Sequence, residues 1–101
     1  MLIEKFIDYL QIEKNYSLNT LSAYKKDLIE FKNFINENFE KYPIEHAEYK
    51  AIRLWIVELV NKNLSNRSIN RKVSSLKSFY KFLVKTDTIG SSPLLAHSPL
   101  K

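Results

Sequence analysis

Apolar residues recur every three or four positions along four stretches of the chain, over roughly residues 2–13, 18–36, 47–62 and 66–85. This spacing is typical of helices that bury one face, and no stretch of useful length alternates as a strand does. The residues expected on the buried faces of the first two helices are Leu2, Ile3, Phe6, Ile7 and Leu10, and then Leu21, Tyr24, Leu28, Phe31 and Ile35. Those of the last two are Ile52, Trp55, Ile56, Leu59 and Val60, and then Ile69, Val73, Leu76, Tyr80 and Leu83. The pattern therefore predicts an all-α protein.

The connections within the two pairs of predicted helices are short and polar. Residues 15–17 separate the first two helices, and Ser17 is placed to cap the second. Residues 63–66 separate the last two, with Ser65 or Asn66 as the capping residue. Because turns of three or four residues make neighbouring helices run antiparallel, we expect an orthogonal bundle of two helical hairpins packed across each other.

The chain changes character after the last predicted helix. Polar and turn-forming residues follow, and Pro93 and Pro99 flank a short apolar stretch. Proline stops helices and favours extended backbone. We therefore expect a helical domain over residues 1–86 and an interdomain linker, cut short, over residues 87–101. Phe82 is expected on the polar side of the last helix, where it would dock the linker or a further domain.

Composition excludes several classes of function. The 101 residues are enough for one domain. The absence of cysteine excludes a disulfide framework, a thiolate zinc site and a cysteine nucleophile, and a single glycine excludes dinucleotide- and phosphate-binding loops. His46 and His97 are the only histidines and have no acidic cluster around them, so we predict no metal site and no cofactor. No apolar run is long enough to span a membrane, and the acidic, amphipathic start of the chain is unlike a signal peptide.

Positive charge is concentrated in one segment. Residues 61–86 contain seven basic residues and no acidic one, whereas the rest of the chain contains nine basic and eleven acidic residues. The segment thus carries a formal charge of +7 and the remainder −2, although the net charge is only +5. Such asymmetry predicts a face that binds a polyanion, and the alternative is a basic helix face that is merely solvated.

On a helical wheel, the polar residues of the last helix gather opposite its apolar stripe. The residues on this face are Arg67, Arg71, Ser74, Ser78, Lys81 and Lys85, with Asn70 and Lys77 at its shoulder. Small serines allow a helix to approach a DNA groove closely, while flanking cations reach phosphates and base edges. Arginine is the better candidate for guanine, because its fork can bond O6 and N7 together.

The start of the second predicted helix forms another polar edge. Its residues are Asn19, Ser22 and Lys26, with Thr20 and Lys25 nearby. The positive end of a helix dipole suits a phosphate group. The alternative is that Ser17 and Thr20 only cap this helix.

Three stretches of the sequence resemble the N-terminal core-binding domain of tyrosine recombinases, most closely that of the Xer type. They are YSLNTLSAYKKDLIEF (residues 16–31), LSNRSINRKVSSLKSFYKFL (residues 64–83) and IGSSPLLAHSPLK (residues 89–101). The resemblance implies a SAM-like bundle of four to five helices that forms half of a clamp on duplex DNA, with the second and fourth helices in the major groove. Thr20, Lys26, Lys72 and Lys77 are carried over by position as DNA-contacting residues.

The resemblance also implies partners and a division of labour. The partners would be double-stranded DNA, the catalytic domain of the same parent chain and other recombinase protomers, four to a synapse, in the bacterial cytoplasm at the nucleoid and without a membrane. The parent would break and rejoin DNA through a 3′-phosphotyrosine formed in a catalytic domain that this chain lacks, so no residue here is predicted to be catalytic. The complete set of predicted DNA-binding residues is Asn19, Thr20, Lys25, Lys26, Arg67, Arg71, Lys72, Ser74, Lys77, Ser78 and Lys81.

Two other interpretations of the sequence stay open. One is a stand-alone helical DNA-binding regulator, and the other is a helical protein-interaction domain whose basic face meets an acidic partner. Chromosome-dimer resolution and mobile-element integration are also equally compatible with the resemblance.

Overall fold

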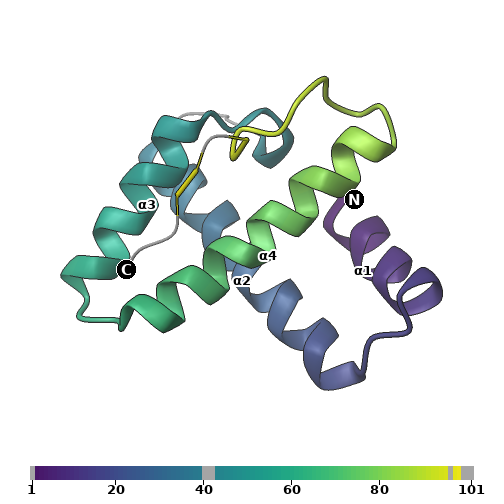
Figure 1. The fold of residues 1–101 in the computed structure, drawn as a ribbon. Helices are drawn as coiled ribbons and strands as arrows, with labels where there is room; N and C mark the ends of the chain where they lie inside the picture. Colours follow the sequence, from purple (N-terminus) through teal and green to yellow (C-terminus); the bar gives the residue numbers. More distant parts are fainter. Residues whose placement is uncertain (1, 40–42, 96, 99–101) are drawn as a thin grey trace.

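The computed structural model describes residues 2–39, 43–95, 97 and 98, and these residues form an all-helical bundle without a strand. The helices are α1 (Leu2–Glu13), α2 (Leu18–Asn38), the short 3₁₀ helix η1 (Ile44–His46), α3 (Tyr49–Asn61) and α4 (Asn66–Lys85). Figure 1 shows α4 crossing α2 near the middle of the bundle, with α1 on one side and α3 on the other. The predicted all-α class and orthogonal arrangement of two helical hairpins are confirmed.

Local sequence explains where the long helices begin. The Ser17 hydroxyl accepts a hydrogen bond from the amide of Thr20 at 3.2 Å, and the Ser65 hydroxyl accepts one from the amide of Ser68 at 3.1 Å. Each satisfies one amide that the first turn of a helix leaves unpaired. Asn15 and Asn63 adopt left-handed backbone conformations in the two turns, which asparagine tolerates better than most residues. These two turns reverse the chain and form the hairpins.

The structure differs from the predicted elements around α3. The helix begins at Tyr49 instead of residue 47, and η1, which was not predicted, precedes it. Val60, expected in the core, is 47% exposed. Ala51 is buried in its place, because the buried sector of α3 lies slightly further round the helix than the large apolar residues alone indicate. The C-terminal end of α2 also differs, because this helix continues to Asn38, two residues past the predicted end.

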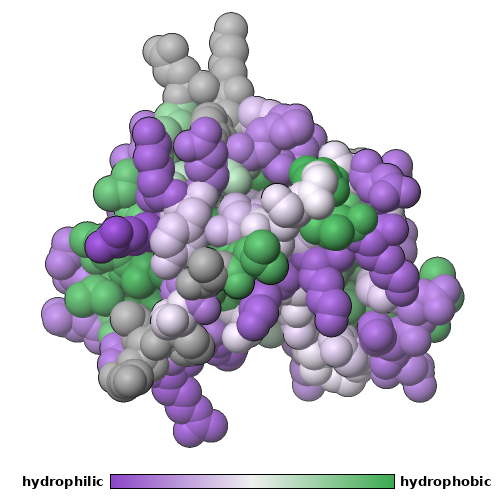
Figure 2. Space-filling view, turned by 45° about the horizontal axis from the view of Figure 1, so that its top comes forward, coloured by the Kyte–Doolittle hydropathy of each residue, from purple (hydrophilic) through white to green (hydrophobic). Residues whose placement is uncertain are grey.

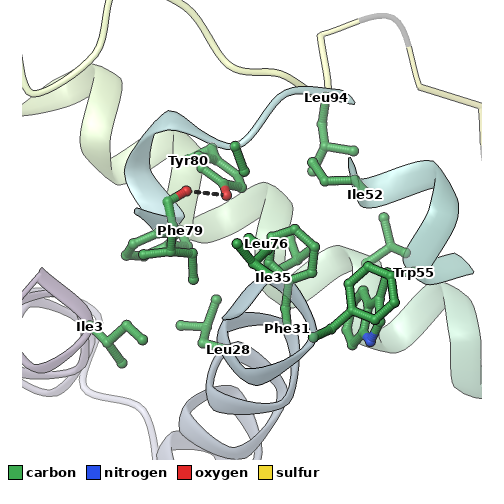
Figure 3. Close-up of a cluster of buried hydrophobic side chains, with 14 of the residues drawn as sticks. Ile3, Leu28, Phe31, Ile35, Ile52, Trp55, Leu76, Phe79, Tyr80 and Leu94 are labelled. Carbon is green, nitrogen blue, oxygen red and sulfur yellow. Dashed lines mark hydrogen bonds between the residues drawn. The ribbon is translucent and has the colours of Figure 1, made fainter. Parts of the chain in front are cut away.

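The core lies where α2 and α4 cross, and α1 and α3 close its sides. Figure 3 shows Leu28, Phe31 and Ile35 of α2 together with Leu76, Phe79 and Tyr80 of α4. The Tyr80 hydroxyl donates a 2.6 Å hydrogen bond to the carbonyl of Ile44, which ties η1 to α4. On the face shown in Figure 2, apolar side chains form separate patches between hydrophilic ones.

Phe82 contacts α1, a packing that the sequence did not predict, and its role as a dock for the linker or a further domain stays a prediction. Its ring centroid lies 5.5 Å from that of Phe6 and 5.0 Å from that of Tyr9. The wheel placed Phe82 outside the apolar stripe, but α1 packs against that flank of α4. The buried sector of α4 is therefore wider than its stripe.

The segment after α4 folds back onto the bundle. Leu94 is 2% exposed and belongs to the buried cluster, and Ile89 packs against it. The Tyr49 hydroxyl lies 2.9 Å from Nδ1 of His97. Of the predicted linker, Ala96 and residues 99–101 lie outside the described residues. The proposed boundary at residue 86 stays a prediction.

None of the helices among the described residues is long and apolar enough to cross a membrane.

Candidate nucleic-acid interface

A groove bordered by several polar residues lies between the start of α2 and the first half of α4. Its volume is about 350 Å³. The residues that line it are Asn19, Thr20, Ala23, Tyr24, Arg71, Ser74 and Ser75. Two polar edges more than forty residues apart in the sequence thus meet at one surface. We call this the α2–α4 groove.

Four of the predicted DNA-binding residues line the α2–α4 groove: Asn19, Thr20, Arg71 and Ser74. Thr20 also has a structural role, because its hydroxyl lies 3.0 Å from that of Ser17 within the cap of α2. Ser17 and Thr20 therefore do form the cap of α2, as the alternative interpretation predicted. It does not exclude a ligand, since Asn19, Arg71 and Ser74 share the groove.

The remaining predicted residues on α4 lie outside the α2–α4 groove. Lys77, Ser78 and Lys81 line a second groove of about 800 Å³, which runs between α1, α4 and the segment after α4. Arg67 is exposed at the start of α4, and Lys25 and Lys26 are exposed on α2. The structure therefore distributes the predicted residues around the α2–α4 groove instead of gathering all of them within it.

The exposed cations of α4 are available to an anionic ligand. Among the described residues, no ion pair holds Arg67, Lys77 or Lys81. Lys85 differs, because its ammonium donates a hydrogen bond of 3.1 Å to the Tyr9 hydroxyl and lies 5.0 Å from the centre of that ring. This hydrogen bond lowers the pKa of Tyr9.

Lys72 is the one predicted DNA-binding residue that the structure buries. It is 8% exposed, and its ammonium lies 2.7 Å from Oε2 of Glu30 and 3.3 Å from Oδ1 of Asp27. Its ion pairs with Asp27 and Glu30 place it on the side of α4 that faces α2. Direct contact with DNA would require it to leave both carboxylates, so we count it as part of the helix interface.

No role was predicted for Asp27, which is fully buried. Its carboxylate accepts hydrogen bonds from Arg71, Lys72 and Ser75. A signal was present in the sequence: Asp27 lies three residues after Tyr24 and four before Phe31, within the apolar stripe of α2. A carboxylate on a buried face needs partners, because burying an unpaired charge is costly.

Comparison with known proteins identifies the class. Residues 3–87 match the profile of the phage integrase N-terminal SAM-like domain, so the chain belongs to that family. No solved structure matches the chain.

Three of the similar relatives are tyrosine recombinases named XerC, each from a bacterium. The chain is 45% identical over 97 residues to the tyrosine recombinase XerC of Anoxybacillus flavithermus, covering 95% of this chain and 32% of the relative. It is 41% identical over 91 residues to XerC of Listeria monocytogenes, covering 89% of this chain and 30% of the relative. The corresponding values for XerC of Bacillus subtilis are 39% over 99 residues, 96% and 32%. The chain thus spans about a third of the length of these relatives, and the resemblance to the Xer type is confirmed.

Proposed function

We propose that this chain is the DNA-binding domain of a site-specific tyrosine recombinase and that it binds duplex DNA through the α2–α4 groove and the exposed cations of α4. The observation that carries the proposal is the convergence of two polar helix edges at one groove, on a helix that also carries the exposed cations Arg67, Lys77 and Lys81. A solvated basic helix would not require a second polar edge from α2. The similarity to tyrosine recombinases along most of the chain supports the same function.

The proposed binding mode places α2 and α4 in the major groove. An α-helix with its side chains is about 10–12 Å wide, close to the width of that groove. Ser74 is small and exposed, so the first half of α4 can approach base edges. The exposed lysines and Arg67 would contact phosphates, which fix position but carry no sequence information.

The wider role of the domain follows from the same proposal. It would form half of a clamp, and the catalytic domain of the parent chain would close the other half. Breaking and rejoining of DNA would belong to that catalytic domain, and we assign no catalytic residue here. Other protomers at the recombination site and a location on the bacterial chromosome would follow from this role.

A second candidate function is protein interaction through the second groove. Apolar residues from three elements line it, among them Phe6, Phe82 and Leu95, and Leu95 is 84% exposed. Exposed apolar surface of this kind is typical of protein-binding sites.

Amide NMR spectra recorded during titration with a duplex of about 30 base pairs, roughly three helical turns, distinguish the two candidates. DNA binding predicts shifts at residues 19–26 and 67–81 that fade as salt rises, because phosphate contacts release counterions. Shifts confined to residues 82–95, or no shifts at all, would contradict the DNA-binding proposal and favour protein interaction.

A further inference from the structure

A cluster of charged and polar side chains joins α2 to α4, and two of its members, Arg71 and Ser75, line the α2–α4 groove. Asp27 and Glu30 come from α2, whereas Arg71, Lys72 and Ser75 come from α4. Asp27 Oδ2 accepts hydrogen bonds from Arg71 at 2.8 Å and from the Ser75 hydroxyl at 2.7 Å. Asp27 Oδ1 accepts from the second terminal nitrogen of Arg71 at 3.3 Å and from Lys72 at 3.3 Å. We call these five residues the Asp27 cluster.

The two cations of the Asp27 cluster lie in different environments. The side chain of Lys72 is 10% exposed and bridges Asp27 and Glu30. The side chain of Arg71 is 52% exposed, binds Asp27 alone and lines the α2–α4 groove. Lys72 and Ser75 already give the buried carboxylate two partners within the helix interface. Arg71 therefore adds a third partner that reaches out toward solvent.

Stability alone does not explain why Arg71 is held. Lys72 and Ser75 already bond one oxygen each of the buried carboxylate, so a partner as exposed as Arg71 is not needed to satisfy it. Holding the fork in one orientation is useful where that orientation matters to a ligand. Arginine has five N–H donors, and the two bonds to Asp27 leave three for the groove.

We propose that Asp27 is a positioning residue that holds the Arg71 guanidinium in the α2–α4 groove, so that Arg71 recognises base edges instead of adding general attraction for DNA. This inference rests on the proposed function. The formal charges of Asp27, Glu30, Arg71 and Lys72 cancel, so the cluster contributes no net charge to the DNA-facing surface. Arg71 then supplies directed hydrogen bonds, while Arg67, Lys77 and Lys81 supply most of the electrostatic attraction.

The test compares two variants that remove the same charge from the same cluster. Asp27→Asn releases Arg71, whereas Glu30→Gln removes one of the two partners of Lys72 and leaves the bonds to Arg71 in place. The probe is the duplex that the wild-type chain enriches from a randomised pool, measured against a shuffled duplex of the same composition. Both variants should bind the shuffled duplex more tightly and steepen the salt dependence by up to about one unit.

Only Asp27→Asn should reduce discrimination between the two duplexes, by about tenfold, which is within the range of one bidentate base contact. Equal discrimination in the two variants, or wild-type discrimination in Asp27→Asn, would overturn the inference.

Arg71→Lys keeps the test decisive if Asp27→Asn does not fold. It retains the positive charge at a half-exposed position but loses the fork. Discrimination should fall while the salt dependence stays unchanged, and wild-type discrimination in this variant would overturn the inference.

The wild-type measurements separate failure of this inference from failure of the proposed function. A wild-type chain that binds both duplexes equally overturns the inference alone. A wild-type chain that binds neither duplex at low salt overturns the proposed function and the inference with it.

Discussion

The two halves of α4 bury different kinds of side chain within one continuous helix. Residues 66–75 contact α2 partly through charged and polar groups, since Lys72 and Ser75 are buried beside Ile69 and Val73. Residues 76–85 bury only apolar and aromatic side chains, from Leu76 to Leu83, apart from the one hydroxyl of Tyr80. The first half borders the α2–α4 groove, and the second half fills the centre of the core.

The difference gives the two halves separate roles: residues 76–85 hold α4 in the bundle, and residues 66–75 orient polar groups at its surface. Buried ion pairs return little net free energy, because the cost of removing charges from water offsets much of their attraction. Apolar burial returns about 25 cal/mol for each Å² removed from water. The second half therefore anchors α4, and the first half is left to orient polar groups. Substitutions in the second half should change stability, whereas those on the outer face of α4 should change DNA binding.

The largest expected effect is on the free energy of unfolding, from a substitution in the second half of α4. Phe79 is fully buried and its ring centroid lies 5.5 Å from that of Phe6. Phe79→Ala should lower the free energy of unfolding by about 3–5 kcal/mol, because it removes a large side chain and leaves a cavity. Chemical denaturation measures this loss. Ser74→Ala, an exposed change in the first half, is the matched control and should stay within about 0.5 kcal/mol of wild type.

Comparable losses in Phe79→Ala and Ser74→Ala would show that the two halves of α4 do not differ in this way.

Lys77 provides the complementary substitution on the outer face. Lys77→Ala should weaken binding to all duplexes by about 1 kcal/mol, the Coulomb energy of two unit charges 4 Å apart in water. The slope of log affinity against log salt should decrease by about one unit, and the unfolding free energy should stay the same. Fluorescence anisotropy at several salt concentrations measures both quantities. Lys50→Ala on α3 is the control, because this exposed lysine lies outside both grooves.

An equal loss of affinity in Lys77→Ala and Lys50→Ala would indicate that only net charge matters and that α4 has no special role.

An effect of similar size, on stability instead of DNA binding, is expected at the one buried polar side-chain group in the second half of α4. Tyr80→Phe removes the hydrogen bond to the carbonyl of Ile44. That carbonyl still accepts from the amide of Ala47, so the cost should be about 1 kcal/mol, that of one hydrogen bond. Thermal unfolding measures it, and Tyr16→Phe at an exposed position is the control. Loss of DNA affinity in Tyr80→Phe would contradict the assignment of stability to the second half of α4 and of DNA binding to its outer face.

The smallest effect concerns the segment after α4. Burial, with a contribution from Lys77, lowers the pKa of His97 from its usual 6.5. The folded chain therefore binds this proton less readily than the unfolded chain, so the stabilising contribution is complete above pH 6.5 and is lost as the pH falls through the lowered pKa. In the protonated ring Nδ1 is a donor, so the Tyr49 hydroxyl must then accept this hydrogen bond.

An NMR titration of the His97 ring, together with the amide of Leu95, measures this coupling. Lys77→Ala should move the pKa of His97 part of the way toward 6.5, because it removes a repelling charge. A ring that titrates at its usual value in wild type would contradict the prediction.

The amino-acid sequence by itself determined the four α-helices, the caps of α2 and α4 and the polar side of α4. The reason is that these features depend on local interactions. Ser17 and Ser65 bond amides three residues away, and the apolar stripes follow from the helical period. The family follows equally from the sequence, since the motif residues occur in order along almost the whole chain.

Only the tertiary structure distinguished Arg71 from Lys72. The two are adjacent basic residues, yet Arg71 lines a groove and Lys72 is buried between two carboxylates. Those carboxylates, Asp27 and Glu30, lie on a crossing helix more than forty residues earlier in the sequence, so only the packing of the two helices brings them to Lys72. Phe82 and Val60 were misplaced for a related reason. The helical period shows which side of a helix is apolar, but the way neighbouring helices pack decides which residues at the edge of that side are covered.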